Sequence, residues 1–489
     1  MKKYTETPLF KRLGSKNAFA LTFAVLCAVL CAILIILSLI PKGAMTADLT
    51  KDGSFSVSDD GKKLAAALDC DVTLYLIASG GAPDTRMLTI LNEYASASDS
   101  ISVQVLHAEG DMGIIRRYVS YSSACDGGII AVSEKRSLYV APETVLSYSE
   151  GALINAMSYY NSYAASDSSV TFSQFLSSYG AYLGLYDGFC HEQVISTALT
   201  YVTSDNVRRL GFISGANAEF FSDALLFSFA ENMIELFDLS LASDIPDGTD
   251  GILIMPTGKD VTASEKQKLS AYVAGGGKVT VSSSYGLEKG YENLSALCAE
   301  MGISSGSGYV FEDDARYYYS SPETLIPVTA DEKNLFLPLC TAITVADTPG
   351  DGVKVTPLLF SSDTAYVKTE LKDGLAFNES TDVRGKRTLA VKSENASGGA
   401  ICYFASSFIL TDDFNYYSGG VNQSFFFSVL NGTLGAQRYI PTAPVKAVST
   451  APIAATENAL YGVIAAGLIL TLGSLAVGLI GGLKRNGEQ

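Results

Sequence analysis

Apolar residues divide the chain into two uncharged ends and a long mixed middle. Two windows, residues 17–41 and 458–483, contain no charged residue. Each exceeds the roughly 20 apolar residues that cross a bilayer as a helix. The pattern therefore predicts transmembrane helices at 18–40 and 459–483, with a large extracytoplasmic part between them.

The basic residues beside these windows predict the orientation of both helices. Five basic residues precede the first window, and Lys484 and Arg485 follow the second. Because positive charge collects on the cytoplasmic side, both tails, 1–17 and 484–489, are expected in the cytoplasm of a two-pass plasma-membrane protein. A secretory signal is the other interpretation of the first window, but its apolar stretch is longer than the roughly 7–15 residues of such a signal.

The residues after the first window alternate strand-like runs with helical spacing. The predicted elements are strands at 72–77, 101–106, 129–132 and 137–140 and a helix at 84–97. The last two strands flank a polar turn, which is typical of a hairpin. We therefore predict a small α/β domain at 45–145. A helical connection at 146–206, including a helix at 191–202, is expected to follow it.

A second and clearer α/β alternation begins after residue 206. The predicted elements are strands at 210–214, 234–239, 251–255 and 278–282 and helices at 218–232, 264–274 and 293–301. The last of these strands follows Gly275-Gly-Gly277, which is expected to end the preceding helix. Such alternation favours a mostly parallel, doubly wound (Rossmann-like) sheet covered by helices.

Beyond residue 302 the pattern changes to short strands and loops. Strands are predicted at 353–356, where Pro357 is expected to end the run, at 387–391 and at 400–405, and a helix at 422–434. We therefore assign residues 207–435 to a doubly wound domain with a β-rich C-terminal extension. Residues 436–457, rich in Pro, Ala and Thr, are predicted to be a stalk linker.

Composition limits the classes of partner. The segment 41–458 carries 27 basic against 49 acidic residues, and such an acidic surface repels the phosphate backbone of nucleic acid. Its six cysteines are scattered singly, without a C-x-x-C pair, so neither a zinc site nor a redox motif is indicated. Their disulfide state stays open.

Two short motifs begin like known sites and then depart from them. His191-Glu192 starts the zinc motif H-E-x-x-H, but Ile195 stands at the second histidine position. Gly277-Lys278 resembles the end of a phosphate-binding loop, but Val279 stands where Ser or Thr is required. The sequence therefore predicts no catalytic residue, no metal site and no cofactor. The carboxylate runs 312–314 and 412–413 are expected in surface loops.

The loops after the parallel strands are the expected place for a ligand. In a doubly wound sheet, ligands bind beyond the carboxyl ends of the strands. The loops at 214–219, 256–258 and 282–285 are rich in Ser and Gly, which suits a small polar ligand better than catalysis. The candidate ligand-binding residues are Ser214, Asn217, Glu219, Thr257, Ser283 and Ser284.

Several pieces occur in an order that is familiar from one family. They are the strand 72–77 with the helix ending at Leu91-Asn-Glu-Tyr-Ala95, the stretch 192–198 before 210–214, the run 262–279 with its Gly-Gly-Gly, and 399–406 before 422. Together they resemble GldG-type auxiliary proteins of ABC transport systems, the gliding-motility-associated auxiliary family. The resemblance implies an outer domain that works beside an ABC permease and a separate cytoplasmic ATPase.

The chain departs from that family in two places. Gly215-Ala-Asn-Ala-Glu219 lacks the histidine of the family's Gly-His-x-Glu element, and the acidic residue expected near Ser406 is absent. Both departures argue against a catalytic or metal site.

These features predict a membrane-anchored, non-enzymatic accessory subunit of an ABC-type transporter. Its extracytoplasmic domain would bind substrate or couple to envelope partners, and its membrane helices would contact the bilayer and the permease. The alternative is a membrane-anchored cell-envelope enzyme or glycan-binding protein. A structural scaffold that binds only protein is a third option.

Overall fold

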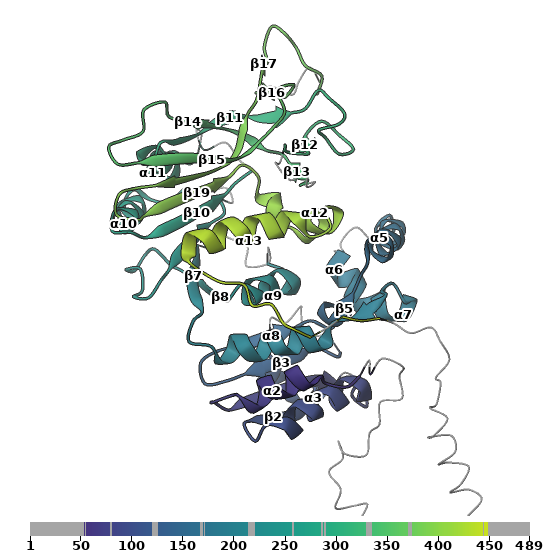
Figure 1. Ribbon diagram of the computed structural model, residues 1–489. Helices are drawn as coiled ribbons and strands as arrows, with labels where there is room; N and C mark the ends of the chain where they lie inside the picture. Colours follow the sequence, from purple (N-terminus) through teal and green to yellow (C-terminus); the bar gives the residue numbers. More distant parts are fainter. Residues whose placement is uncertain are drawn as a thin grey trace, which may run out of the picture.

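A computed structural model gives the fold of the chain (Figure 1). It describes residues 53, 55–78, 81–119, 126–166, 170, 172–213, 221–256, 259–284, 287, 290–328, 335–369, 374–443 and 445–447. The protein is a mixed α/β protein with several sheets. None of the helices in these ranges is long and apolar enough to cross a membrane. The predicted membrane segments, 18–40 and 459–483, lie outside the described residues.

The first sheet has the strand order β2-β1-β3-β4 and confirms the predicted elements. Strand β1 (Val72–Ala78) pairs in parallel with β2 (Ile101–His107), and β3 (Ile129–Val132) forms the predicted hairpin with β4 (Ser137–Val140). Helix α3 (Thr85–Ala97) begins at Asp84, whose side chain accepts hydrogen bonds from the first turn. Helices α2 (Asp59–Ala66) and α4 (Ala108–Ile115) complete this unit.

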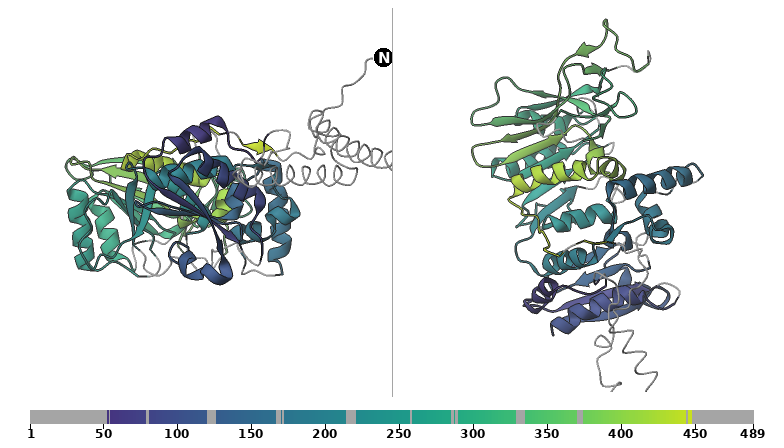
Figure 2. Two further views of the ribbon diagram at one scale, coloured as in Figure 1. Left: turned by 90° about the horizontal axis from the view of Figure 1, so that it is seen from below. Right: turned by 45° about the vertical axis from the view of Figure 1, so that its right-hand side comes forward.

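Helix α8 (His191–Thr203) joins the first sheet to the rest of the molecule. Its apolar side chains Val194, Ile195, Ala198, Leu199 and Val202 share one buried cluster with the strands β1 and β3 and with α9 (Asp223–Glu231). Ten of its residues are buried, so it lies between two layers and does not cover a surface. Figures 1 and 2 show this order from the first sheet through α8 and α9 to the large sheet.

The large sheet has a parallel half and an antiparallel half. The parallel strands, in the order β8-β7-β9-β10-β19, are β8 (Ile234–Asp238), β7 (Arg208–Ile213), β9 (Gly251–Ile254), β10 (Lys278–Ser282) and β19 (Ala400–Phe404). The helices between or after them are α9, α10 (Ala263–Ala274), α11 (Glu292–Glu300) and α13 (Val421–Leu434). This half matches the predicted alternation.

The antiparallel half makes the sheet mixed, whereas a mostly parallel sheet was predicted. Its strands are β18 (Thr388–Glu394), β15 (Lys354–Phe360), β14 (Thr341–Val345), β11 (Ile303–Phe311), β16 (Tyr366–Lys368) and β17 (Val383–Arg384). The strands of this half follow one another without crossover helices, and strands joined in this way pair antiparallel.

Two local predictions about glycine and proline have different outcomes. Helix α10 ends at Gly275, and Gly276 has φ 101°, so the glycines act as the predicted helix end. Pro357, by contrast, does not end its strand, because β15 continues to Phe360. Among the described strands, β15 pairs with β18, with register shifts after Pro357, and its other edge makes an isolated bridge at Phe360 with Val328, so the missing proline N–H costs no ladder bond on that edge.

The remaining elements connect these units. They are η2 (Pro142–Val145), β5 (Leu146–Ser147), α5 (Glu150–Ala164), α6 (Phe172–Phe175), the π-helical turn η3 (Leu176–Gly180), α7 (Ala181–Leu183), β6 (Gly188–Phe189), β12 (Thr324–Leu325), β13 (Leu337–Pro338), η5 (Ser407–Leu410), α12 (Asp412–Tyr417) and β20 (Lys446–Ala447). Of these, α5, α6 and α7 form a lateral extension (Figure 1). Strand β6 pairs with both β5 and β20, so the end of the described chain returns to the segment just before α8.

Candidate functional site

The predicted ligand site at the carboxyl ends of the parallel strands is only partly described. Ser214, Asn217, Glu219 and Thr257 lie outside the described residues. Ser283 and Ser284 follow β10 and are buried. They lie beside the residues that follow β19, Ser406 and Ser407, because β10 and β19 are parallel neighbours. We call Ser282, Ser283, Ser284, Ser406 and Ser407 the serine edge.

Hydrogen bonds within the protein already use the hydroxyls of the serine edge. The Ser284 hydroxyl lies 3.0 Å from that of Ser407 and accepts the Ser407 backbone N–H at 3.0 Å. Ser406 donates to the carbonyl of Pro338 in β13 at 2.6 Å, and Ser282 donates to the carbonyl of Ser406 at 3.1 Å. The serine edge is therefore a closed joint between β10, β19 and β13.

The motif histidine is also part of the protein interior. His191 begins α8, is 1% exposed, and stacks on Phe55 with ring centroids 6.2 Å apart. Across the described ranges, no three His, Cys, Asp or Glu side chains lie together in a way that could hold a metal ion.

The two carboxylate runs match the predicted surface loops only in part, because Asp313 is exposed in a loop whereas Glu312 and Asp412 are not exposed. Glu312 is 1% exposed and accepts hydrogen bonds from Ser362 at 2.8 Å and Thr364 at 2.6 Å. Asp412 begins helix α12 and is partly buried. The polar partners of both residues come from segments far away or later in the chain, so a short window of sequence gives no sign of them.

Asp412 lines a cavity that lies between the first α/β unit and the large sheet. The cavity has a volume of about 490 Å³, within the range of pockets for small molecules. Its wall comes from η2, β5, η3, α8, α9, α12 and α13 and from residues 438–441. The side chains used in the argument below are Glu143, Thr144, Tyr148, Cys190, Gln193, Ser228, Glu231, Asp412, Gln423 and Arg438.

Two carboxyl groups of the cavity have raised pKa values, which favours their neutral forms. Burial raises the pKa of Asp412 to about 6, and the nearby Asp413 and Asp223 act in the same direction. Hydrogen bonds to Asp412, including one of 3.4 Å from Gln423, oppose that shift. Burial also raises the pKa of Glu231, although Arg438 counteracts it at 3.4 Å. Perturbed carboxyl groups of this kind concentrate at functional sites.

The cavity wall also holds two buried hydroxyls, those of Tyr148 and Thr144. Neither the Tyr148 hydroxyl nor the Thr144 hydroxyl has a hydrogen-bond partner among the residues that the structure describes. Buried polar atoms are almost always satisfied by protein or by a bound molecule. Cys190 is different, because its thiol contacts the Thr144 carbonyl at 3.3 Å and burial raises its pKa to about 12. That cysteine is a protonated wall residue and not a nucleophile.

One wall of the cavity is made by the segment that follows α13, residues 436–447, which we call the strap. The backbone N–H of Tyr439 donates to the Glu231 carbonyl at 2.8 Å, and Arg438 pairs with the Glu231 side chain. Further along, Gln193 of α8 donates to the Ala443 carbonyl at 2.7 Å. The strap therefore connects the cavity to β20, its final described element.

Sequence reasoning did not find this cavity. Its wall residues come from segments centred near positions 145, 193, 228, 415 and 440, and none of them belongs to a known motif. The one available signal was the acidic pair 412–413 followed by the aromatic residues of 414–417 in an otherwise helical window.

Comparison with known proteins gives no family for the chain. No family model and no curated protein matches it. Among solved structures, the mmIFT52 N-terminal domain is similar at TM-score 0.34 and 17% identity, over 47% of this chain and 97% of that one. A cold-adapted β-galactosidase from Rahnella sp. R3 is similar at TM-score 0.26 and 13% identity, over 51% of this chain and 34% of the enzyme. The exo-β-1,4-mannosidase Op5Man5 from Opitutaceae bacterium strain TAV5 is similar at TM-score 0.28 and 12% identity, over 50% and 38%.

These likenesses are too low to assign a function. The chain spans about a third of the two glycosidases. The fold and the cavity define a mixed α/β protein with an acidic cavity between its two units.

Proposed function

We propose that the chain is a membrane-anchored accessory subunit of an ABC-type transporter, whose extracytoplasmic α/β part binds a small polar ligand in the cavity. In this proposal the segments 18–40 and 459–483 are the two membrane helices, with both tails in the cytoplasm. The ATPase and the permease are separate partner subunits. The observation that carries the proposal is the strap, because it forms one wall of the cavity and ends beside the first described residue.

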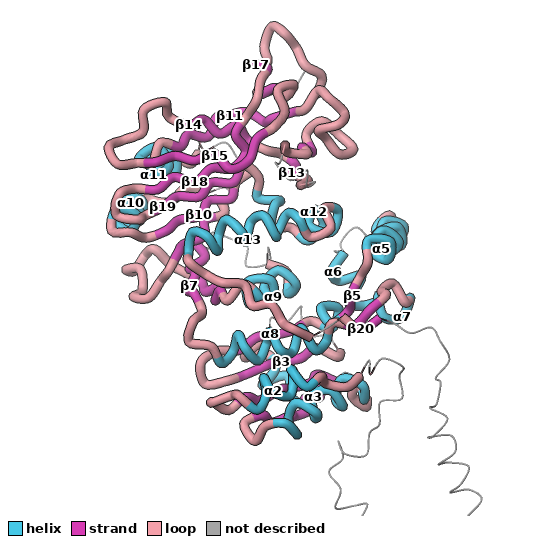
Figure 3. The backbone as a smooth tube through the Cα atoms, viewed as in Figure 1, coloured by secondary structure: helices cyan, strands magenta, loops and turns pink. Residues whose placement is uncertain are grey.

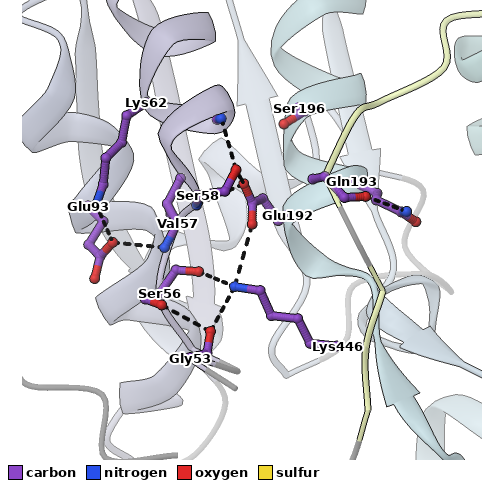
Figure 4. Close-up of polar contacts among 12 residues, drawn as sticks. Gly53, Ser56, Val57, Ser58, Lys62, Glu93, Glu192, Gln193, Ser196 and Lys446 are labelled. Carbon is purple, nitrogen blue, oxygen red and sulfur yellow. Dashed lines mark hydrogen bonds and ion pairs between the residues drawn. The ribbon is translucent and has the colours of Figure 1, made fainter. Parts of the chain in front are cut away.

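The two ends of the described chain meet at a buried lysine (Figure 4). Lys446 of the strap donates to the carbonyls of Gly53, at 2.8 Å, and Ser56, and lies 3.5 Å from the Glu192 carboxylate. Lys446 is 9% exposed and Glu192 is 1% exposed. The Glu192 carboxylate also accepts the backbone N–H of Ser58 at 2.9 Å. The chain is thus fastened at one point where it enters and leaves the described part.

This fastening point supports a two-helix anchor that responds to the cavity. About a dozen residues lead from Gly53 back to the first apolar segment, and about a dozen lead from Ala447 to the second. Both segments therefore start from the same side of the extracytoplasmic part. A change in the cavity that moves the strap would be transmitted along the shortest covalent route to the second membrane segment.

The charge of the cavity favours a ligand with a positive group. Its described wall carries three carboxylates, Glu143, Glu231 and Asp412, against one basic side chain, Arg438. An ammonium group stabilises the ionised form of a carboxyl group that burial destabilises. The Tyr148 and Thr144 hydroxyls, which have no partner among the described residues, offer hydrogen bonds for further polar groups. We therefore infer a small amine that also carries hydroxyl or carbonyl groups.

Co-purification tests the transporter role. The tagged full chain would be expressed in its native host, solubilised in mild detergent and analysed by mass spectrometry. We expect an ABC permease and its ATPase in near-stoichiometric amounts. A matched control replaces 459–483 with an unrelated spanning helix and should lose the permease while it keeps the outer fold. Recovery of the chain alone, or with enzymes of envelope glycans, would contradict the role.

A titration tests the ligand class separately. Glucosamine and N-acetylglucosamine are matched probes, because acetylation removes the positive charge and keeps the sugar. Isothermal titration of the full chain in detergent is expected to show binding of the amine only, with loss of binding in Asp412→Asn. Equal binding of both sugars, or unchanged binding in the variant, would contradict the assignment of an amine to this cavity.

The raised pKa of Asp412 also favours the alternative of an envelope enzyme. A carboxyl group with a pKa of about 6, with a second carboxyl group beside it, is suited to act as a general acid. Chromogenic glycosides offered to the full chain test this alternative. It requires turnover that Asp412→Asn abolishes, and an absence of turnover would leave the accessory role as the better explanation.

A further inference from the structure

The lateral extension of the molecule exposes apolar side chains on its outer face. Ile154 is 64% exposed and Tyr159 49% exposed on α5, and Tyr182 is 86% exposed and Leu183 40% exposed on α7. We call these four residues the α5–α7 face. The two helices are connected through α6 and η3, and exposed large apolar side chains in one such region are candidates for contact with a partner or a membrane.

The α5–α7 face belongs to a well-packed part of the structure. The opposite side of α5 buries Ala156 and Met157 in a cluster with Phe172, Phe175 and Leu176. Aromatic contacts fix this cluster, such as that between Phe172 and Tyr416 with ring centroids 4.8 Å apart. The exposed side of α5 is uncharged and mixed: Ile154 and Tyr159 lie about 140° apart around the helix, with the exposed polar residues Asn155, Ser158 and Ser162 between them. Such an uncharged surface of Tyr, Ile and small polar side chains suits an interfacial layer better than a dry apolar contact.

The charge of this region contrasts with the rest of the extracytoplasmic part. Residues 151–186 contain one charged residue, Asp167, whereas 41–458 contains 27 basic and 49 acidic residues. Seven tyrosines lie within 148–186. Tyrosine is enriched where membranes meet water, because its ring is apolar and its hydroxyl is hydrated. Tyr159 and Tyr182 are exposed, whereas Tyr148, Tyr160, Tyr163 and Tyr179 pack against the buried cluster. The uncharged surface around Tyr159 and Tyr182 also avoids the repulsion between acidic protein and anionic lipid.

The position of the face relative to the chain end identifies its partner. Strand β6 follows α7 after a few residues and pairs with β20, which contains the last described residue, Ala447 (Figure 3). About a dozen residues lead from Ala447 to the second apolar segment, and a chain of that length spans at most about 40 Å. The α5–α7 face therefore lies on the side of the molecule that is tethered to the predicted membrane segment.

We propose that the α5–α7 face rests in the headgroup layer of the membrane that holds the chain's apolar segments. Tyr182 and Leu183 would enter the interface, and Tyr159 and Ile154 would lie along it. This contact would fix the orientation of the extracytoplasmic part above the bilayer. The proposal rests on the membrane anchoring within the proposed function and does not depend on a transporter partner or on a ligand in the cavity.

The absence of tryptophan from the chain makes a direct test available. Tyr182→Trp introduces a single tryptophan into the full-length protein. The variant would be reconstituted in nanodiscs of phosphatidylcholine, either plain or brominated on the acyl carbons nearest the headgroup. We expect the emission to shift to shorter wavelength and to lose about half or more of its intensity in brominated lipid, as for an interfacial side chain.

A matched control sits at the opposite end of the molecule. Val383 on β17 is 62% exposed and apolar, and Figure 1 shows β17 far from α5 and α7. Val383→Trp is expected to emit at the wavelength of solvent-exposed tryptophan, with no quenching by brominated lipid. Tyr159→Trp is a second variant of the α5–α7 face and should be quenched as Tyr182→Trp is.

The outcomes separate this proposal from the anchoring on which it rests. A chain that inserts into nanodiscs but shows equal emission of Tyr182→Trp in plain and brominated lipid overturns the bilayer contact alone. A blue shift that appears only when a membrane protein partner is co-reconstituted, without quenching, also overturns it and assigns the face to that protein. A chain that does not insert into nanodiscs overturns both the anchoring and the contact.

Discussion

The serine edge and the cavity show two opposite ways of placing polar groups inside one protein. At the serine edge, the hydroxyls of Ser282, Ser284 and Ser406 form hydrogen bonds with one another and with nearby backbone atoms. In the cavity, the hydroxyls of Tyr148 and Thr144 have no hydrogen-bond partner in the described part of the chain, and burial raises the pKa of Asp412. Satisfied polar groups stabilise a joint, whereas unsatisfied ones around an empty volume are suited to a ligand.

The serine edge and the cavity also differ in how they are held in place, and the strap is the main reason for this difference. The serine edge is fixed by parallel strand pairing between β10 and β19. The cavity is closed by the strap, whose two-residue strand β20 pairs with β6 and whose other contacts are single hydrogen bonds and ion pairs, such as that of Lys446 with Glu192. The strand pairing of the strap is thus shorter than that of the serine edge, as expected for an element that moves.

The largest expected effect comes from Lys446→Met, which keeps the apolar stem and removes the charge. Glu192 is 1% exposed, and removal of one partner of a buried ion pair costs about 3–5 kcal/mol because the other charge stays buried. Thermal unfolding of the full chain in detergent should show a clear loss of stability. The double variant Lys446→Met/Glu192→Gln should recover part of it.

Lys63→Met is the matched control for this prediction. Lys63 pairs with Asp60 at 2.9 Å, but both side chains are exposed, so its loss should leave unfolding unchanged. If Lys446→Met unfolds like Lys63→Met, the strap is not fastened as the structure indicates, and the comparison of the two regions loses its basis.

The second prediction concerns the pH dependence that Asp412 contributes. Its pKa is raised from 3.8 to about 6, so the folded state binds a proton that the unfolded state releases between these values. Stability therefore falls as the pH rises from about 4 to 6, by at most about 3 kcal/mol. Asp412→Asn should flatten the melting temperature across this window and raise it at pH 7.

Asp314 provides the contrasting carboxyl group. Arg316 lowers the pKa of Asp314 to about 2, so its stabilising contribution is present above pH 4 and is lost only below that pH. Asp314→Asn should leave the profile between pH 4 and 6 unchanged. A profile that is equally steep in wild type and Asp412→Asn would show that Asp412 is not buried as described.

The same contrast explains what the sequence predicts well. Local patterns locate β1, α3, the β3–β4 hairpin and α10, because apolar period and caps such as Asp84 and Thr262 act within one segment. They also give the parallel half of the large sheet. The sequence did not predict that β15 continues through Pro357. A strand tolerates a proline when its N–H faces an edge without ladder bonds, and only the topology of the sheet shows which edge that is.

The candidate site is less predictable for a related reason. The rule that ligands bind beyond parallel strand ends pointed to Ser283 and Ser284. Ser407, which comes much later in the chain, occupies the hydrogen-bonding position of the Ser284 hydroxyl, and the neighbouring Ser406 donates to Pro338 of β13. The cavity depends on five distant segments, and the raised pKa of Asp412 results from their packing. The sequence shows that a carboxyl group is present but not whether the fold buries it, and burial is what raises its pKa.

The smallest effects compare one hydroxyl from each region. Ser284→Ala removes the group that accepts the Ser407 backbone N–H at 3.0 Å and leaves that donor buried, which should cost about 1–3 kcal/mol. Tyr148→Phe removes a buried hydroxyl with no described partner, so the free energy of unfolding should stay the same or rise by up to about 1 kcal/mol. Thermal unfolding in ligand-free detergent solution measures both.

A destabilised Tyr148→Phe would mean that the Tyr148 hydroxyl is already hydrogen-bonded in the ligand-free protein, and the cavity would then resemble the serine edge. Opposite signs for the two variants would show that the protein satisfies its polar groups at the joint and leaves them available in the cavity.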